Sequence, residues 1–220
     1  MMIWLIAAGA AVAVAHGPIL SARLPEPADA ARLSKLPYKQ LATPRRIVWL
    51  VAIALAAQLA TIASTPWPAW LVYGSGVAAL IWVDAYTTWL PLTLNWLVTG
   101  ELVLAASLWC WITADPGLAL RMAAGAMASL AFWWLFWRIS RGGFGFGDVR
   151  LAPLAGAMAA TLGLQGWFAA LLATTVLGVI WGLTIGRLHP APGSRGGFAY
   201  GPALWAGPYV AMAWVAFFHG

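Results

Sequence analysis

The acidic residues are the part of this sequence best suited to chemistry, because the 220-residue chain has only six of them. Three occur in polar or turn sequence: Glu26, Asp29 and Asp115. The other three occur within or at the edge of long apolar runs: Asp84, Glu101 and Asp148. An acid inside a membrane span costs about 2.5–3.5 kcal/mol on insertion scales and usually marks a functional site. The second group therefore holds the candidate functional residues.

Asp84 and Asp148 are predicted to form an acid/base pair. Asp84 lies in ALIWVDAYTTWLP and Asp148 in RGGFGFGDVRLAP, each near the end of an apolar run that faces the same side of the membrane. In aspartyl proteolysis one carboxylate takes a proton from water, while the other, protonated, hydrogen-bonds the scissile carbonyl. Two like charges held close together do not both ionise, so such a pair shares a proton.

Glycines lie close before Asp148, and a proline lies close after Asp84. Four glycines precede Asp148: Gly142, Gly143, Gly145 and Gly147. They provide backbone freedom and remove side-chain bulk, which would let an extended substrate approach closely; a plain flexible turn is the alternative. Pro91 follows Asp84 by seven residues, where it would end one helix and start the next.

Glu101 lies in the middle of an apolar run, and its interpretation is structural rather than catalytic. We expect a neutral acid that faces the protein interior and has a hydrogen-bond partner. Arg121 is a candidate partner, but a simple antiparallel hairpin would separate the two in height. The three histidines have no metal-ligand spacing, and Cys110 is the only cysteine, so we expect no metal and no cofactor.

The composition indicates that the chain is a membrane protein, so membrane helices must position these acidic residues. Hydrophobic residues make up 63% of the chain and charged residues 8%, against about a quarter in soluble domains. The apolar runs are long and lack a period of two, which favours helices over a barrel. The predicted fold is all-α, a polytopic bundle of about eight transmembrane helices. The predicted spans are 2–19, 47–64, 69–86, 91–112, 118–138, 151–164, 167–186 and 202–218.

The first span could be a signal peptide, but it lacks a basic amino-terminal region, and we predict a retained helix. We predict two parts: residues 1–46, with the first helix and a short basic loop, and a membrane-embedded core over residues 47–220. The formal charge of +6 could indicate nucleic acid or anionic lipid as a partner. The distribution of that charge favours orientation in the membrane instead, with no nucleic acid partner.

Basic residues gather in alternate connections between the spans. Eleven of the twelve lie after the first, fifth and seventh spans: Arg23, Arg32, Lys35, Lys39, Arg45, Arg46, Arg138, Arg141, Arg150, Arg187 and Arg195. The positive-inside rule places these loops in the cytoplasm and both termini outside. Several tryptophans near the opposite span ends are expected to form an interfacial belt: Trp67, Trp70, Trp109, Trp111 and Trp167.

Three segments together resemble the type IV prepilin peptidases. Asp84 followed by Pro91 resembles the first catalytic motif of that family, and Gly145-Phe-Gly-Asp-Val-Arg-Leu151 resembles its second, the GxGD motif. Tyr200-Gly-Pro-Ala-Leu204 is similar to the FGP-containing last span. The matches extend over about residues 70 to 215. Their order, spacing and shared side of the membrane make the joint pattern fairly specific.

The resemblance implies an eight-helix GxGD-type aspartyl peptidase in the bacterial plasma membrane, with its active site facing the cytoplasm. Asp84 and Asp148 carry over as catalytic residues, and Gly145, Gly147, Arg150 and Pro91 lie near the substrate. The expected partners are single-span prepilins or pseudopilins and membrane lipid. Such a hydrolase needs no cofactor.

The sequence also departs from the family pattern. Many members carry two Cys-x-x-Cys pairs in an amino-terminal domain associated with N-methylation, and this chain has none. We therefore expect peptidase activity without a structural zinc and without methyltransferase activity. Leu92 stands where an acid or amide often follows the proline, and Arg150 replaces a usual lysine.

Other functions compete with the peptidase. A presenilin-like or signal-peptide-peptidase-like protease also pairs a membrane aspartate with GxGD, but that group's Pro-Ala-Leu motif is absent near the last span. A proton-coupled transporter would use the same intramembrane acids, although such proteins often contain inverted repeats, and none is evident here. An inactive assembly scaffold is the third alternative.

Overall fold

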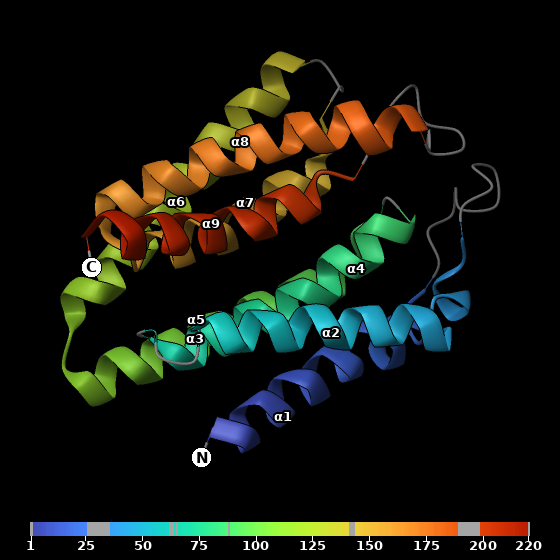
Figure 1. Ribbon diagram of the computed structural model, residues 1–220, viewed down its shortest axis with the longest axis horizontal. Helices are drawn as coiled ribbons and strands as arrows, with labels where there is room; N and C mark the ends of the chain where they lie inside the picture. The colour runs from blue at the N-terminus through green and yellow to red at the C-terminus, as the bar shows by residue number, and fades with distance from the viewer. Residues whose placement is uncertain are drawn as a thin grey trace. The chain divides into compact units, whose positions relative to one another are not determined.

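Regular secondary structure is entirely helical in the described residues of the computed structural model (Figure 1). The structure describes residues 2–25, 36–61, 64, 66–87, 89–140, 144–188 and 199–219. The predicted all-α fold class is therefore confirmed. In chain order the elements are α1 (Met2–Val14), the π-helical turn η1 (Ala15–Leu20), the 3₁₀ turn η2 (Tyr38–Gln40), α2 (Pro44–Thr61), α3 (Trp67–Val72), the π-helical turn η3 (Tyr73–Val77), α4 (Ala78–Thr87), α5 (Leu92–Thr113), α6 (Pro116–Ser140), α7 (Phe146–Ala160), α8 (Gly163–Leu188) and α9 (Gly201–His219).

The eight predicted spans correspond to eight helical segments in the same order. Within the described residues, six are long and apolar enough to cross a membrane: α2, the continuous helix α3–η3–α4, α5, α6, α8 and α9. The first segment has a 17-residue apolar stretch, and α7 has 15 residues. At 1.5 Å per residue α7 is only about 22 Å long, less than the hydrocarbon thickness of about 30 Å. The chain is a polytopic membrane protein with six full-length candidate spans and two shorter helices.

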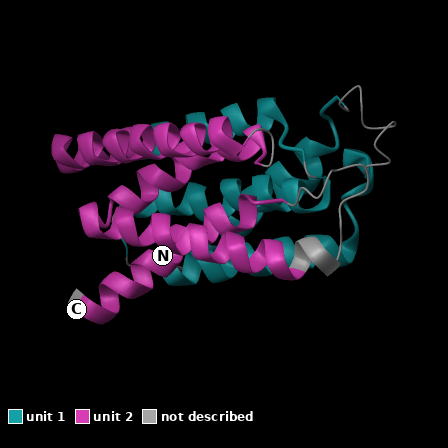
Figure 2. Cartoon of the chain, turned by 90° about the horizontal axis from the view of Figure 1, so that it is seen from above, with its two compact units in different colours: residues 1–105, 191–195 teal, residues 106–190, 196–220 magenta. Residues whose placement is uncertain are grey.

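Two compact units divide the chain within α5 (Figure 2). One unit contains residues 1–105 and 191–195, and the other contains residues 106–190 and 196–220. The first helix therefore belongs to the unit that also contains Asp84. This division by packing is distinct from the predicted division at residue 46, which stays a prediction.

In the first unit, α1 packs along α2, and both contact the helix α3–η3–α4 (Figure 1). The Gln58 amide of α2 crosses this interface by donating to the carbonyl of Leu71 at 3.1 Å. Gly9 makes room for the Gln58 side chain, because a Cβ there would lie 2.7 Å from its Cγ. Small residues allow membrane helices to approach closely enough for such hydrogen bonds.

In the second unit, α6 packs on α7 and α8 packs on α9, and α7 contacts both members of the second pair. Gly125 of α6 and Gly156 of α7 face each other, and a Cβ on Gly125 would lie 2.5 Å from the Gly156 carbonyl oxygen. The Trp167 indole N–H donates to the Gly125 carbonyl at 3.2 Å and to the Ser129 hydroxyl at 3.0 Å. This polar contact ties α8 to α6 inside a largely apolar core.

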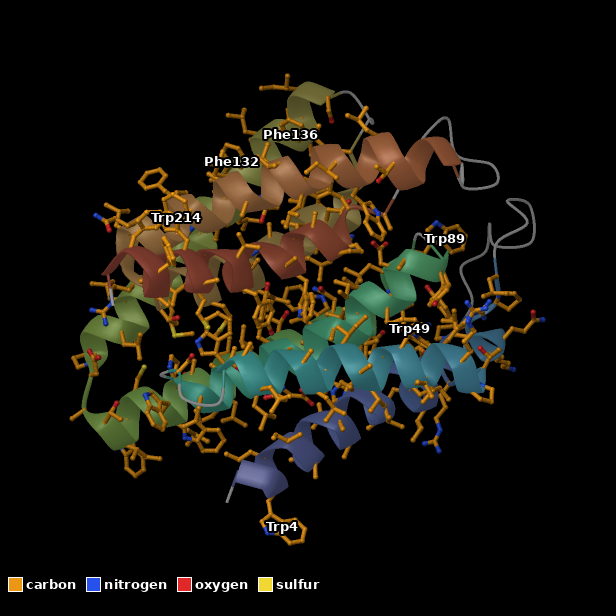
Figure 3. All side chains as sticks on the ribbon, viewed as in Figure 1. Trp4, Trp49, Trp89, Phe132, Phe136 and Trp214 are labelled. Atoms are coloured by element: carbon orange, nitrogen blue, oxygen red, sulfur yellow. The ribbon has the colours of Figure 1, made fainter. Side chains whose placement is uncertain are left out.

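Large apolar side chains also cover the outside of the helices, as expected for contact with lipid. Trp4 and Trp214 point away from the ribbon in Figure 3, and Trp111 is 79% exposed. Trp70 is fully buried, and Trp167 makes the interior hydrogen bonds described above. Trp70 therefore packs inside its unit and Trp167 is partly buried, while the interfacial belt as a whole stays a prediction.

Gly125→Ala should destabilise the second unit. The added methyl group must push α6 and α7 apart, and overpacking of this kind costs about 1–3 kcal/mol. We expect the thermal unfolding midpoint in detergent micelles, followed by circular dichroism, to fall by several degrees. Gly100→Ala is the matched control, because a Cβ there has no atom within 4 Å. Equal midpoints for the two variants would contradict the close approach.

Candidate active site

The two predicted catalytic aspartates lie in different units, Asp84 in the first and Asp148 in the second. Both side chains are buried, with Asp84 8% exposed and Asp148 7% exposed. The candidate site therefore consists of two half-sites, each built by the helices of its own unit. That the two carboxyl groups meet stays a prediction.

The first half-site is the last turn of α4, where Asp84 is followed by the helix end at Thr87. The Thr87 hydroxyl donates to the Val83 carbonyl at 2.8 Å and accepts from the Trp89 N–H at 3.2 Å. The first is a threonine hydrogen bond back to the carbonyl four residues earlier, and the second gives a partner to a backbone N–H just beyond the helix end. They hold the helical turn that carries Asp84 against the residues that follow α4.

Two aromatic residues flank Asp84 and fix its turn to α2. The Trp82 indole N–H donates to the Arg46 carbonyl at 3.0 Å. The Arg46 guanidinium lies 4.7 Å from the centroid of the Tyr86 ring, which contacts Trp82 edge to face at 5.9 Å. Residues two before and two after Asp84 are thus anchored to one arginine at the start of α2. The sequence places Arg46 only in the basic loop, and no spacing in it indicates these contacts with Trp82 and Tyr86.

Pro91 lies between α4 and α5, as expected from its position. It is buried, α5 begins at the next residue, and its carbonyl accepts a hydrogen bond from the Asn95 N–H at 3.0 Å. A proline at this point fits the start of a helix because the missing N–H would have no helical partner there. Its predicted proximity to substrate is not tested by these contacts.

The second half-site is the first turn of α7, where Asp148 lies three residues after the N-cap Gly145. The Asp148 N–H donates to the Gly145 carbonyl at 3.2 Å. Unpaired backbone N–H groups and the helix dipole make this position favourable for a negative charge. A Cβ on Gly145 would lie 3.0 Å from Oδ2 of Asp148.

The backbone at Gly145 does not itself need a glycine, because its φ of −73° and ψ of 137° are open to any residue, and Gly147 is part of α7. A Cβ at 145 would require the Asp148 carboxylate to shift by a few tenths of an ångström. The predicted role of the two glycines in admitting an extended substrate stays a prediction. Gly142 and Gly143 lie outside the described residues.

An aromatic cluster holds the segment before Asp148. Phe144 is buried and stacks on Trp133 of α6 with ring centroids 5.2 Å apart and planes at 15°. It also contacts Phe136 at 5.4 Å and Tyr200 at 5.1 Å. The cluster connects the chain before α7 to α6 and to the start of α9. Sequence reasoning missed it because aromatic residues are so frequent here that no spacing distinguishes these four.

Tyr200 joins the third predicted motif to the Asp148 half-site. Its hydroxyl donates to the Thr174 carbonyl of α8 at 2.9 Å, and its ring occupies the space where Gly178 would carry a Cβ. Burial, and secondarily the negative charge of Asp148, raise the pKa of the Tyr200 hydroxyl well above its usual range. The second and third motifs, which are far apart in the sequence, thus lie together within the second unit.

Arg150, the basic residue of the second motif, lies over the ring of Phe146 with its guanidinium carbon 4.9 Å from the ring centroid. Phe146 is 42% exposed and contacts Trp137 of α6 at 5.0 Å. Phe146 and Arg150 are four residues apart and so lie on the same face of α7. Asp148 lies two residues from each of them, on a different face of the helix.

The remaining described acids have local partners. Asp115 accepts from the Leu118 N–H at 2.9 Å, as the N-cap of α6, and lies 3.7 Å from the Arg121 guanidinium. Glu101 has a partner, as predicted, but the partner is His16 at 2.9 Å. Arg121, the candidate partner from the sequence, pairs with Asp115. Glu26 and Asp29 lie outside the described residues.

No group of three or more potential metal ligands occurs among the described residues. Comparison with known proteins gave no match: no family model, no curated protein and no solved structure is significantly similar to this chain. The functional argument therefore depends on the residues and their geometry.

Tyr200→Phe should remove part of the loss of stability at alkaline pH. Unfolded tyrosine ionises near pH 10, whereas the pKa of folded Tyr200 is higher, so stability falls as pH rises through about 10 to 11.5. The phenylalanine variant cannot ionise and should lose less stability over that window, measured by denaturation in micelles. Tyr86→Phe, at an exposed tyrosine of the other unit, is the control. Identical pH profiles for Tyr200→Phe and the parent would contradict the assignment.

Proposed function

We propose that this chain is an intramembrane aspartyl endopeptidase that removes the leader peptide of type IV prepilins or pseudopilins. In this proposal it acts at the cytoplasmic face of the bacterial plasma membrane, with Asp84 and Asp148 as the catalytic pair. The proposal rests on the resemblance of three segments to the prepilin peptidases. The structure adds support from the surroundings of the two aspartates.

The observation that carries the proposal is that both aspartates are buried at helix ends in a chain with few acids. Burying a carboxylate among apolar membrane helices is costly, so a fold that buries two of them is expected to use them. Each belongs to a rigid turn: Asp84 between the anchored Trp82 and Tyr86, and Asp148 beside Gly145 and the packed Phe144. Catalytic groups need such fixed surroundings to hold their geometry.

The helix ends suggest different roles for the two acids. Asp148 lies in the first turn of α7, where the helix dipole favours a carboxylate. Asp84 lies in the last turn of α4, where the dipole disfavours one. We assign Asp148 as the base that takes a proton from the attacking water. Asp84 is then the acid that donates a hydrogen bond to the scissile carbonyl oxygen as water attacks its carbon.

Both Asp84→Asn and Asp148→Asn should abolish cleavage of a candidate prepilin by the membrane-embedded enzyme. Asparagine preserves the shape of each side chain but can neither take the proton nor share it. The assay measures the cleaved product on a gel at matched expression. Thermal midpoints equal to the parent value would attribute the loss to chemistry rather than to unfolding.

Cleavage that survives in either variant would contradict the proposed pair. A parent that stays inactive toward several prepilins and pseudopilins, while correctly folded, would favour the inactive scaffold or the proton-coupled transporter. Proton uptake by reconstituted vesicles separates those two alternatives, because only the transporter would move protons.

Gly145→Ala should lower turnover without comparable loss of stability. Its methyl group would lie 3.0 Å from Oδ2 of Asp148, so the carboxylate must shift by a few tenths of an ångström. We expect a loss smaller than the roughly 100-fold that a 1 Å misplacement of a catalytic group can cost. Gly100→Ala, with open space around the new methyl group, should keep the parent turnover. Equal turnover for the two variants would remove the argument from close approach.

A further inference from the structure

A buried histidine and a mid-helix acid meet in the first unit, and the peptidase proposal uses neither. Nε2 of His16 lies 2.9 Å from Oε1 of Glu101, and Nδ1 lies 2.8 Å from the carbonyl oxygen of Val12. The His16 side chain is 7% exposed and that of Glu101 is 33% exposed. A buried ionisable contact in a membrane helix is a candidate for a specific role.

The two contacts of His16 determine where its protons are. The Val12 carbonyl can only accept a hydrogen bond, so Nδ1 must carry a proton. The contact between Nε2 and Oε1 needs a single further proton, because two lone pairs facing each other would repel. The three groups thus form a chain that has no net charge, wherever that second proton lies.

The other oxygen of Glu101 indicates which side holds the proton. Oε2 is buried and accepts no hydrogen bond from the described residues. It faces Gly76 of η3, where an added Cβ would lie 3.8 Å away. A buried carboxylate oxygen without a donor is far more costly than a neutral carbonyl oxygen in the same place. The arrangement with the proton on Oε1, donated to Nε2, therefore has the smaller cost.

This chain of hydrogen bonds connects the first helix to the rest of its unit. Glu101 lies on the buried stripe of α5 with Val98 and Leu94, while much of the helix is exposed. On the other side, Gly17 follows His16 and packs so closely on α2 that a Cβ there would lie 2.5 Å from Leu50. That Cβ would also lie 3.5 Å from the ring of Trp82, two residues before Asp84.

We propose that Glu101, His16 and the Val12 carbonyl form a neutral hydrogen-bond relay that fastens the first helix to α5 in the unit that carries Asp84. Glu101 donates to Nε2 of His16, and Nδ1 of His16 donates to Val12. The relay is a structural lock and does not depend on peptidase activity.

The test compares glutamine and leucine at position 101. Glutamine can still donate an amide N–H to Nε2, so Glu101→Gln should keep the parent thermal midpoint in micelles. Glu101→Leu and His16→Leu break the relay and should each lower the midpoint by about 2–4 °C. The double leucine variant should fall by less than the sum, because both substitutions remove the same interaction. Gly100→Ala, next to Glu101 with open space around the new methyl group, is the control and should not fall below the parent midpoint.

The protonation state of His16 has a direct spectroscopic signature. The chain has three histidines, so ¹⁵N-histidine labelling gives few signals, and His16→Gln assigns the relevant pair. We expect a neutral imidazole with the proton on Nδ1, and a shift of the Nε2 signal in Glu101→Leu. An imidazolium signal at neutral pH, or Glu101→Gln as unstable as Glu101→Leu, would overturn the neutral relay. Glu101→Leu as stable as Gly100→Ala, with unchanged histidine signals, would overturn the lock itself.

Discussion

The cost of acidic groups in an apolar helical environment is the constraint on which the rest of this structure depends. A chain with six carboxylates keeps three of them in apolar surroundings, and each lies at a distinct kind of position. Asp148 occupies the first turn of a helix, Asp84 the last turn of another, and Glu101 pairs with a histidine. Because hydrocarbon offers no solvation, the fold must provide the compensating groups itself.

Small residues and aromatic side chains provide the rigidity that those positions need. Gly125 and Gly156 let α6 and α7 touch, so the helix that carries Asp148 cannot slide freely. The stack of Phe144 on Trp133 then fixes the chain that enters this helix. In the first unit the hydrogen bond from Trp82 to the Arg46 carbonyl fixes the turn that carries Asp84. Membrane helices gain little from hydrophobic association, so such close packing carries much of the specificity.

The helices and their order could be predicted from the sequence because membrane-spanning helices appear in it as long apolar runs. Pro91 likewise marks the start of α5, whereas α7 begins at Phe146, five residues before the predicted span and inside the glycine-rich segment. Contacts across long sequence separations could not be predicted in this way. His16 and Glu101 are 85 residues apart, and His16 was considered only as a metal ligand. The interior position of Trp70 and the aromatic cluster around Phe144 depend on tertiary packing, which a composition rich in tryptophan does not reveal.

We propose that Asp84 and Asp148, each held by the helices of its own unit, act as one catalytic pair. Disulfide formation between Asp84→Cys and Asp148→Cys in native membranes, with Cys110→Ala as background, tests this pairing, because bridged cysteines need Cα atoms within about 7 Å. We expect efficient cross-linking of this pair and none between Asp84→Cys and Asp115→Cys, which the proposed orientation places on opposite sides of the membrane. Failure of the first pair to cross-link, in a folded protein whose cysteines both react with a small thiol reagent, would contradict it.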